Sequence, residues 1–120
     1  MDVTDEMMDG FLSQTHDINP LHTDEAFACG RGFHGRVVYG MLTASFLSTL
    51  AGVYLPGKYS LIHSVQVEFP NPVFVGDTLN VSGSVTEIDE RFRIFTMKIT
   101  IKNQNGKKVC RGKMRIGVSE

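Results

Sequence analysis

The chain has 120 residues, of which 42% are hydrophobic and 21% are charged, and this composition is typical of one globular domain rather than of a disordered segment. Its formal net charge is -1, so there is no broad basic surface to bind nucleic acid. Cys29 and Cys110 are not spaced as a pair, and the acidic N-terminus lacks the basic and then apolar pattern of a secretory signal. We therefore expect a cytoplasmic protein.

The N-terminal part of the sequence predicts two short helices with an ordered turn between them. Thr4 is predicted to cap a helix that ends near Thr15, because two acidic residues follow the cap and apolar residues then recur at helical spacing. The stretch Asp17–His22 contains an Asn-Pro pair and is predicted to form a turn. Thr23 is predicted to cap the second helix, which stops at Gly30.

The stretch Val37–Gly57 carries no charge and is long enough to be considered as a membrane span. Small and hydroxyl-bearing residues interrupt it, namely Gly40, Thr43, Ser45, Ser48, Thr49 and Gly52. We therefore predict no membrane span. A helix buried on most sides is predicted from Gly40 to Ala51, closed by Gly52 and the Pro56-Gly57 turn.

Beyond this turn the hydrophobic period changes from helical to two, which predicts strands. The strands are expected near residues 64–69, 78–87, 93–102 and 108–118, and Asn105-Gly106 is expected to join the last two as a hairpin. In the third strand, Phe95, Met97, Ile99 and Ile101 share one face. Helices followed by an antiparallel meander predict a single α+β domain over residues 1–120, with the uncharged helix covering the sheet.

Asp17 and His22 are candidates for an acid–base pair, because they flank an Asn-Pro turn that restricts the loop between them. Spacing alone leaves a second interpretation open. Aspartate and asparagine often cap turns through their own backbone, and an isolated histidine is commonly structural.

A set of motifs resembles that of the (R)-specific enoyl-CoA hydratases of the MaoC-like family: DINPLHTDEAFA, VVYGMLTASFLS, LPG and FPNPVFVGDTL, in this order. The resemblance covers nearly the whole chain. It implies a hot-dog fold, in which an antiparallel sheet wraps around a long central helix. It also implies a homodimeric lyase of fatty-acid metabolism that reversibly hydrates a trans-2-enoyl-CoA thioester to the (R)-3-hydroxyacyl thioester, with no cofactor beyond the carrier and no metal.

The same resemblance implies roles for individual residues. Asp17 and His22 hold and activate the water, and the backbone N–H of Gly40 meets the charge that develops on the thioester oxygen. Asn19 shapes the site, and Ser48 faces it from the long helix. Plain structural roles stay open for three of these residues. Asn19 is equally suited to an Asx turn, Gly40 to packing, and Ser48 to a bond with its own helix.

The sequence departs from the family pattern in two places. The long helix begins with Tyr39-Gly40-Met41, where the resemblance leads us to expect His-Gly-Met. A phenol stays neutral at pH 7, so Tyr39 is expected to support the helix start without titrating. The chain also starts at the first predicted helix, whereas relatives have a strand before it, so we expect one sheet edge to be uncovered or remodelled.

Other functions remain open at this stage. The same chemistry on an acyl carrier protein, in fatty-acid, polyketide or surface-sugar acyl synthesis, is not distinguished by the sequence. A hot-dog thioesterase or a non-catalytic acyl-binding subunit are further alternatives. His34 and Arg36 are candidates for contacts with coenzyme A phosphates. The cluster of His16, Asp17, His22 and Asp24 has no recognised metal-ligand spacing.

Overall fold

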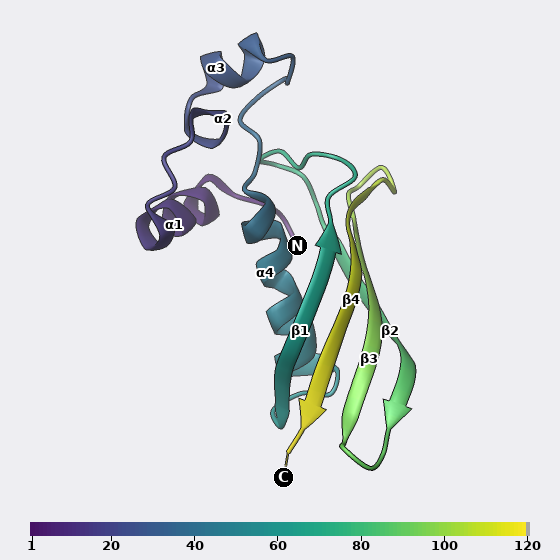
Figure 1. Cartoon of the computed structure of the whole chain (residues 1–120). Coiled ribbons are helices and arrows are strands. Elements are labelled where there is room, and N and C mark those ends of the chain that lie inside the picture. Colours follow the sequence, from purple (N-terminus) through teal and green to yellow (C-terminus); the bar gives the residue numbers. More distant parts are fainter. Residues whose placement is uncertain (120) are drawn as a thin grey trace.

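The computed structural model of the protein describes residues 1–119, in which helices precede a four-stranded antiparallel sheet (Figure 1). The elements are α1 (Asp5–Thr15), α2 (Pro20–Thr23), α3 (Glu25–Gly30), α4 (Gly40–Thr49), the π-helical turn η1 (Leu50–Tyr54), β1 (Ser60–Glu68), β2 (Asn80–Asp89), β3 (Ile94–Lys102) and β4 (Lys108–Val118). Helix α4 lies along one face of the sheet, and α1, α2 and α3 lie near the N-terminal end of α4 (Figure 1). This is the predicted α+β arrangement of a long helix covered by an antiparallel sheet.

The first helix is confirmed, and the cap of the next predicted helix is corrected. Thr4 caps α1 by accepting a hydrogen bond from the Met7 backbone N–H at 3.2 Å. Thr23 is not a cap, because the predicted turn before it already contains a helical turn, α2, in which Thr23 is the last residue. Asp24 instead caps α3 and accepts a hydrogen bond from the Phe27 N–H at 3.1 Å.

The long uncharged helix begins at Gly40 as predicted, but it does not end at Gly52. The regular α-helix ends at Thr49, and the chain continues as η1 to Tyr54 because Leu50 keeps helical backbone angles. The left-handed glycine that ends this stretch is Gly57, with φ 102°, and its N–H donates to the Ala51 carbonyl at 2.9 Å. No helix within residues 1–119 is both long enough and apolar enough to cross a membrane.

The strands run in the order β1-β4-β3-β2, and every neighbouring pair is antiparallel. The predicted hairpin between the last two strands is confirmed, since the Asn103 N–H donates to the Lys107 carbonyl at 2.9 Å and Gly106 has φ 76°. The first predicted strand starts earlier than expected, at Ser60, and the second runs from Asn80 to Asp89. Strands β2, β3 and β4 follow one another as in the predicted meander, but β1 pairs with β4 instead of β2, which corrects the predicted order of the sheet.

The core lies between α4 and the inner face of the sheet. In β3, Met97, Ile99 and Ile101 are fully buried, which confirms the predicted apolar face. Leu42 and Leu47 of α4 belong to the same buried cluster. Burial of each such side chain contributes about 1.5–3 kcal/mol to folding, so this layer holds the site's framework in place.

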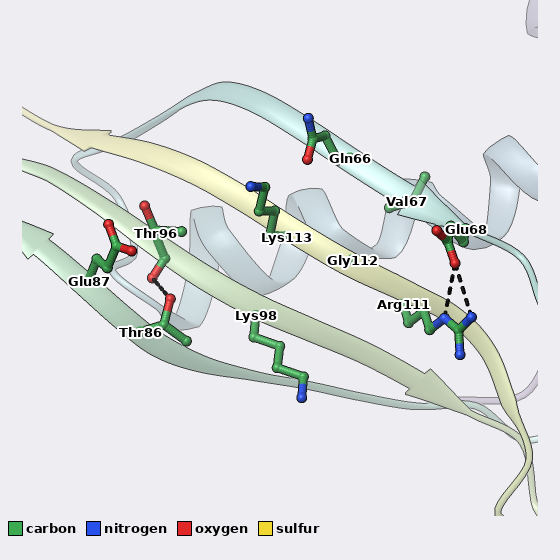
Figure 2. A pocket seen from close by; sticks show the side chains of 10 residues that line it. All are labelled: Gln66, Val67, Glu68, Thr86, Glu87, Thr96, Lys98, Arg111, Gly112 and Lys113. Carbon is green, nitrogen blue, oxygen red and sulfur yellow. Dashed lines mark hydrogen bonds and ion pairs between the residues drawn. The ribbon is translucent and has the colours of Figure 1, made fainter.

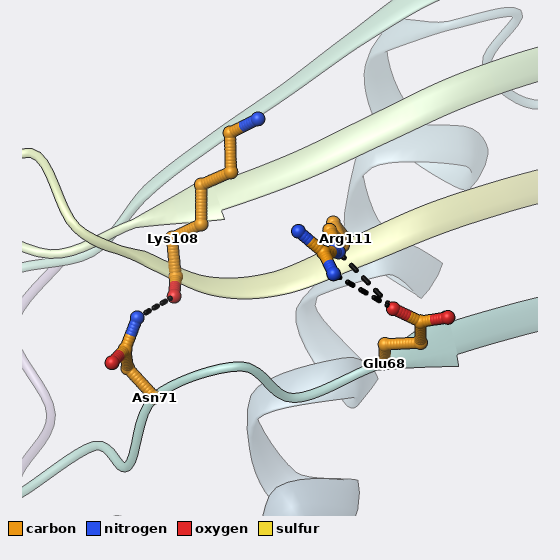
Figure 3. Close-up of polar contacts among 4 residues, drawn as sticks. All are labelled: Glu68, Asn71, Lys108 and Arg111. Atoms are coloured by element: carbon orange, nitrogen blue, oxygen red, sulfur yellow. Dashed lines mark hydrogen bonds and ion pairs between the residues drawn. The ribbon is translucent and has the colours of Figure 1, made fainter.

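The outer face of the sheet is polar. A hollow there is lined by side chains such as Lys98, Arg111 and Lys113, and Glu68 forms an ion pair with Arg111 at 3.0 Å (Figure 2). Close by, the Asn71 side-chain amide donates to the Lys108 carbonyl at 2.8 Å (Figure 3). This bond ties the loop after β1 to the start of β4.

The stretch before α1 is paired, which corrects the expectation that the chain starts at the first helix. Val3 exchanges backbone hydrogen bonds with the loop before β2: its N–H donates to the Asp77 carbonyl at 2.9 Å, and its carbonyl accepts from Gly76 at 2.8 Å. The Leu79 N–H donates to the Met1 carbonyl at 2.7 Å, and the Val3 side chain is buried. The first residues therefore cover part of the edge beside the start of β2.

Candidate active site

The loop that carries Asp17 is shaped by two successive side-chain turns. An oxygen of the Asp17 carboxylate accepts a hydrogen bond from the Asn19 N–H at 3.1 Å, and Asn19 Oδ1 accepts from the Leu21 N–H at 2.9 Å. Pro20 then starts α2 with its backbone angle already set for a helix. Asn19 therefore makes the Asx turn that the sequence left open, and this turn directs the chain from Asp17 to His22.

His22 is half-buried near the end of α2, and one of its two ring nitrogens already forms a hydrogen bond. Its Nδ1 lies 2.7 Å from the Val37 carbonyl oxygen. Because a carbonyl oxygen can only accept, the proton of a neutral ring is on Nδ1, and Nε2 keeps its lone pair. This is the tautomer that a general base needs.

Tyr39 links the two candidate acid–base residues. Its hydroxyl donates a hydrogen bond to the Asp17 backbone carbonyl at 2.9 Å, and its ring centroid lies 4.3 Å from that of His22. On another side, the ring packs against Phe11 at 4.6 Å. Burial raises the pKa of the phenol above its ordinary value of 10, and the Asp17 carboxylate raises it further. Tyr39 is thus a neutral donor at pH 7, but its hydroxyl bonds the Asp17 loop and makes no cap bond to the helix start that it was predicted to support.

Gly40 is the first residue of α4, so its N–H belongs to the first turn, where backbone donors have no acceptor within the helix. The first helical bond nearby is made by Thr43, whose N–H donates to the Tyr39 carbonyl at 3.1 Å. A Cβ on Gly40 would meet the Phe69 ring at 3.4 Å. This is an ordinary van der Waals distance, so the Phe69 ring does not by itself require glycine at this position.

A cavity of about 310 Å³ lies against the start of α4. His22 and Gly40 line it together with residues that the sequence analysis did not single out: Phe33, Val37, Val38, Thr43, Phe69, Pro70, Asn71, Pro72, Val73 and Val109. Larger hollows of about 680 and 770 Å³ lie on the outer face of the sheet, and none of the predicted site residues lines them. The cavity of about 310 Å³ combines His22 with the N-terminus of the long helix α4.

Other predicted contacts do not reach this cavity. Ser48 is exposed about two turns further along α4 and does not line the cavity. His34 stacks on Phe74, with ring centroids 3.9 Å apart, and Arg36 pairs with Asp5 at 2.6 Å. The Arg36 charge is therefore already paired. Among residues 1–119, no group of three or more His, Cys, Asp or Glu side chains is arranged to hold a metal ion.

Two of the lining residues that the sequence analysis missed had a usable signal. Thr43 lies one helical turn after Gly40 and therefore shares its side of α4. Phe69 begins the motif FPNPVFVGDTL, whose family resemblance was noted but assigned no role in the site. The other walls, such as Val109 on β4, come together only in the folded chain.

His22, with its Nε2 unpaired, and the N-terminus of α4 meet at this cavity, while Asp17 is exposed on the neighbouring loop and does not line it. Together they form a candidate acid–base site at one end of the helix-and-sheet layer. The family model described as "MaoC like domain" matches residues 1–107. The chain belongs to this MaoC-like family.

Individual relatives agree with this assignment. An (R)-specific enoyl-CoA hydratase from Aeromonas caviae is 42% identical over 96 residues, which cover 80% of this chain and 72% of the relative. A mitochondrial 3-hydroxyacyl-[acyl-carrier-protein] dehydratase from Arabidopsis thaliana is 34% identical over 74 residues, 62% of this chain and 43% of the relative. The solved structure of the A. caviae (R)-hydratase involved in PHA biosynthesis superposes with a TM-score of 0.94 at 34% identity, covering 99% of this chain and 90% of that one. The hot-dog fold predicted from the motifs is therefore confirmed.

Proposed function

We propose that this protein is a lyase that catalyses the reversible hydration of a trans-2-enoyl-CoA thioester to the (R)-3-hydroxyacyl thioester. The observation that carries the proposal is the geometry of His22, which lines the cavity beside Gly40. Its Nδ1–H donates a hydrogen bond to the Val37 carbonyl, and its Nε2 is left free. The similarity to an (R)-specific enoyl-CoA hydratase supports the choice of substrate class.

The reaction requires a proton to leave water as it attacks carbon. Asp17 and His22 hold the water, and His22 Nε2 accepts its proton while the water oxygen bonds to C3 of the enoyl group. The C2–C3 π electrons move toward the thioester, and charge develops on its oxygen. The Gly40 N–H and the positive end of α4 stabilise that charge. His22 then returns the proton taken from water to C2, which restores the neutral imidazole and completes the addition of water.

A second copy of the chain is the proposed partner. Strand β1 pairs only with β4 in the described sheet and is therefore an edge strand. Its neighbourhood exposes apolar side chains, including Leu61 at 64%, Tyr54 at 73% and Val53 at 64%. An unpaired edge with large exposed apolar groups is typical of a surface that is covered in an assembly. We propose a homodimer through this edge, in a cytoplasmic setting.

The proposed activity is tested by incubating the purified protein with crotonyl-CoA and with longer 2-enoyl-CoA thioesters in the presence of a chelator. We expect loss of the enoyl chromophore and formation of the (R) product. Thioester cleavage without hydration would point instead to a thioesterase, and no turnover across acyl lengths would point to a non-catalytic acyl-binding subunit.

Dehydration of a 3-hydroxyacyl group on an acyl carrier protein is the second candidate, because the Arabidopsis relative carries that name. The two candidates share the site chemistry and differ in the carrier. Comparison of kcat/KM for the same acyl group on CoA and on an acyl carrier protein separates them. We expect the CoA thioester to be preferred.

A further inference from the structure

Thr43 stands out in the core because it is a buried polar residue with nothing to bind. It lies in α4 with 1% of its surface exposed. Its hydroxyl oxygen is the one buried side-chain polar atom among residues 1–119 that has no hydrogen-bond partner. Buried hydroxyls are nearly always paired, so an unpaired one requires a specific explanation.

The helix itself offers this hydroxyl an acceptor that it does not use. Threonine in a helix commonly donates to the carbonyl one turn back. That carbonyl belongs to Tyr39, and it accepts the Thr43 backbone N–H at 3.1 Å but not the hydroxyl. The Thr43 hydroxyl is therefore a donor that no group of the protein uses.

The position of Thr43 directs it toward the start of the helix. Side chains in a helix tilt toward its N-terminus, so that of Thr43 lies over the turn containing Gly40, three residues earlier. Gly40 has no side chain to block this approach, and both residues line the cavity with His22. The remaining wall is largely apolar, and the amide of Asn71 is engaged with the Lys108 carbonyl. Thr43 is thus a polar group without a protein partner at the place where the thioester is proposed to bind.

We propose that the Thr43 hydroxyl is a second donor to the acyl thioester, binding its carbonyl oxygen together with the Gly40 N–H. The inference rests on the proposed hydratase function and adds to it a side-chain donor on α4. Its hydrogen bond to this oxygen becomes stronger as negative charge develops there. Such a bond lowers the barrier of the chemical step more than it tightens substrate binding.

The test compares Thr43→Val, which keeps the shape and removes the hydroxyl, with Thr43→Ser, which keeps the hydroxyl. In Thr43→Val we expect kcat for crotonyl-CoA hydration to fall about tenfold or more, with KM changed less. The melting temperature of the ligand-free variant should equal or exceed that of the wild type, because an unpaired buried hydroxyl has been removed. Thr43→Ser should retain kcat within about threefold.

Thr49→Val is the matched control, since Thr49 is an exposed residue at the other end of the same helix and does not line the cavity. It should leave kcat and KM unchanged. Wild-type turnover in Thr43→Val, or a parallel loss of stability and activity, would show that the hydroxyl serves only the core. An inactive wild type would instead remove the proposed function, and this inference with it, so the two failures are distinguishable.

Discussion

The sheet and the segment that carries the candidate acid–base pair are stabilised by different means. Strands β3 and β4 present fully buried side chains to the core, among them Ile99, Met114 and Ile116. Residues 16–36, in contrast, contain one buried residue, Ala28, and are held by hydrogen bonds and by stacking on Tyr39. The candidate acid–base residues therefore lie on a part of the chain with little apolar burial, and the packed layer between α4 and the sheet supplies the rigidity.

The largest expected effect tests the sheet. A Cβ on Gly112 in β4 would lie 1.8 Å from the Gln66 backbone oxygen of β1, which cannot move without breaking the strand pairing. We expect Gly112→Ala to lower the free energy of unfolding by at least about 3 kcal/mol, measured by urea denaturation. Gly10→Ala is the control, because a Cβ at Gly10 in α1 meets nothing within 4 Å, and alanine there should stabilise the helix by up to about 1 kcal/mol. Equal effects in the two variants would contradict the close approach of β1 to β4.

The next effect is on turnover rather than on folding. Asp17→Asn and His22→Ala should each lower kcat by at least about a hundredfold, which corresponds to roughly 2.7 kcal/mol, the usual scale for a lost acid–base group. Because the two groups act on one water, the double variant should be little worse than either single one. The melting temperature should change little, since both residues lie outside the core. His34→Ala, at an exposed histidine that does not line the cavity, is the control and should keep wild-type kcat. Near-normal turnover in a folded Asp17 or His22 variant would show that the pair is misassigned.

The smallest effect concerns Tyr39, which joins the two regions. Tyr39→Phe removes the hydrogen bond to the Asp17 carbonyl and should cost about 1 kcal/mol of stability or of transition-state binding. Tyr39→His should remain active, because imidazole can also donate a hydrogen bond. Kinetics and melting curves of both variants measure this. A Phe variant identical to the wild type in both would assign the ring to packing alone.

The same residue predicts a pH dependence. Burial and the Asp17 carboxylate raise the pKa of Tyr39 in the folded protein above its ordinary value of 10. The folded state therefore holds this proton more tightly than the unfolded chain, so its contribution is complete below about pH 10 and is lost as the pH rises toward the folded pKa. The stability difference between the wild type and Tyr39→Phe should shrink on this alkaline side. A difference independent of pH from 8 to about 11 would contradict the burial of the phenol.

The parts of the fold that depend on local signals could be predicted from the sequence. The cap at Thr4, the alternation in β3 and the hairpin at Asn105-Gly106 each depend on neighbouring residues. Thr23 was wrong as a cap because Asn19 and Pro20 already start a separate short helix, α2, which ends at Thr23, and Asp24 then caps α3. A four-residue helix has no hydrophobic period of its own, so the local pattern did not reveal it.

The site was predicted only in part, for a related reason. The motif resemblance pointed to Asp17, His22 and Gly40 as candidates. The structure brings His22 and Gly40 to one cavity, whereas Asp17 lies outside it and is connected to His22 only through Tyr39. The Tyr39 hydroxyl and the Asp17 carbonyl are 22 residues apart, and no periodicity predicts their bond. The unpaired hydroxyl of Thr43 is likewise a property of its surroundings, which a single sequence does not contain.

The Asn71–Lys108 hydrogen bond has a consequence for how substrate preference can diverge. It anchors the loop that forms much of the cavity wall to β4. At its far end the same loop is tied to the segment that holds His22, because the Val38 N–H donates to the Val73 carbonyl at 2.8 Å. Mutations in residues 69–72, ahead of this contact, can therefore reshape the space for the acyl group with less effect on His22 than a mutation of Val73. Among related proteins, we expect differences in preferred acyl length to follow substitutions in that stretch, while the proton-transfer chemistry stays the same.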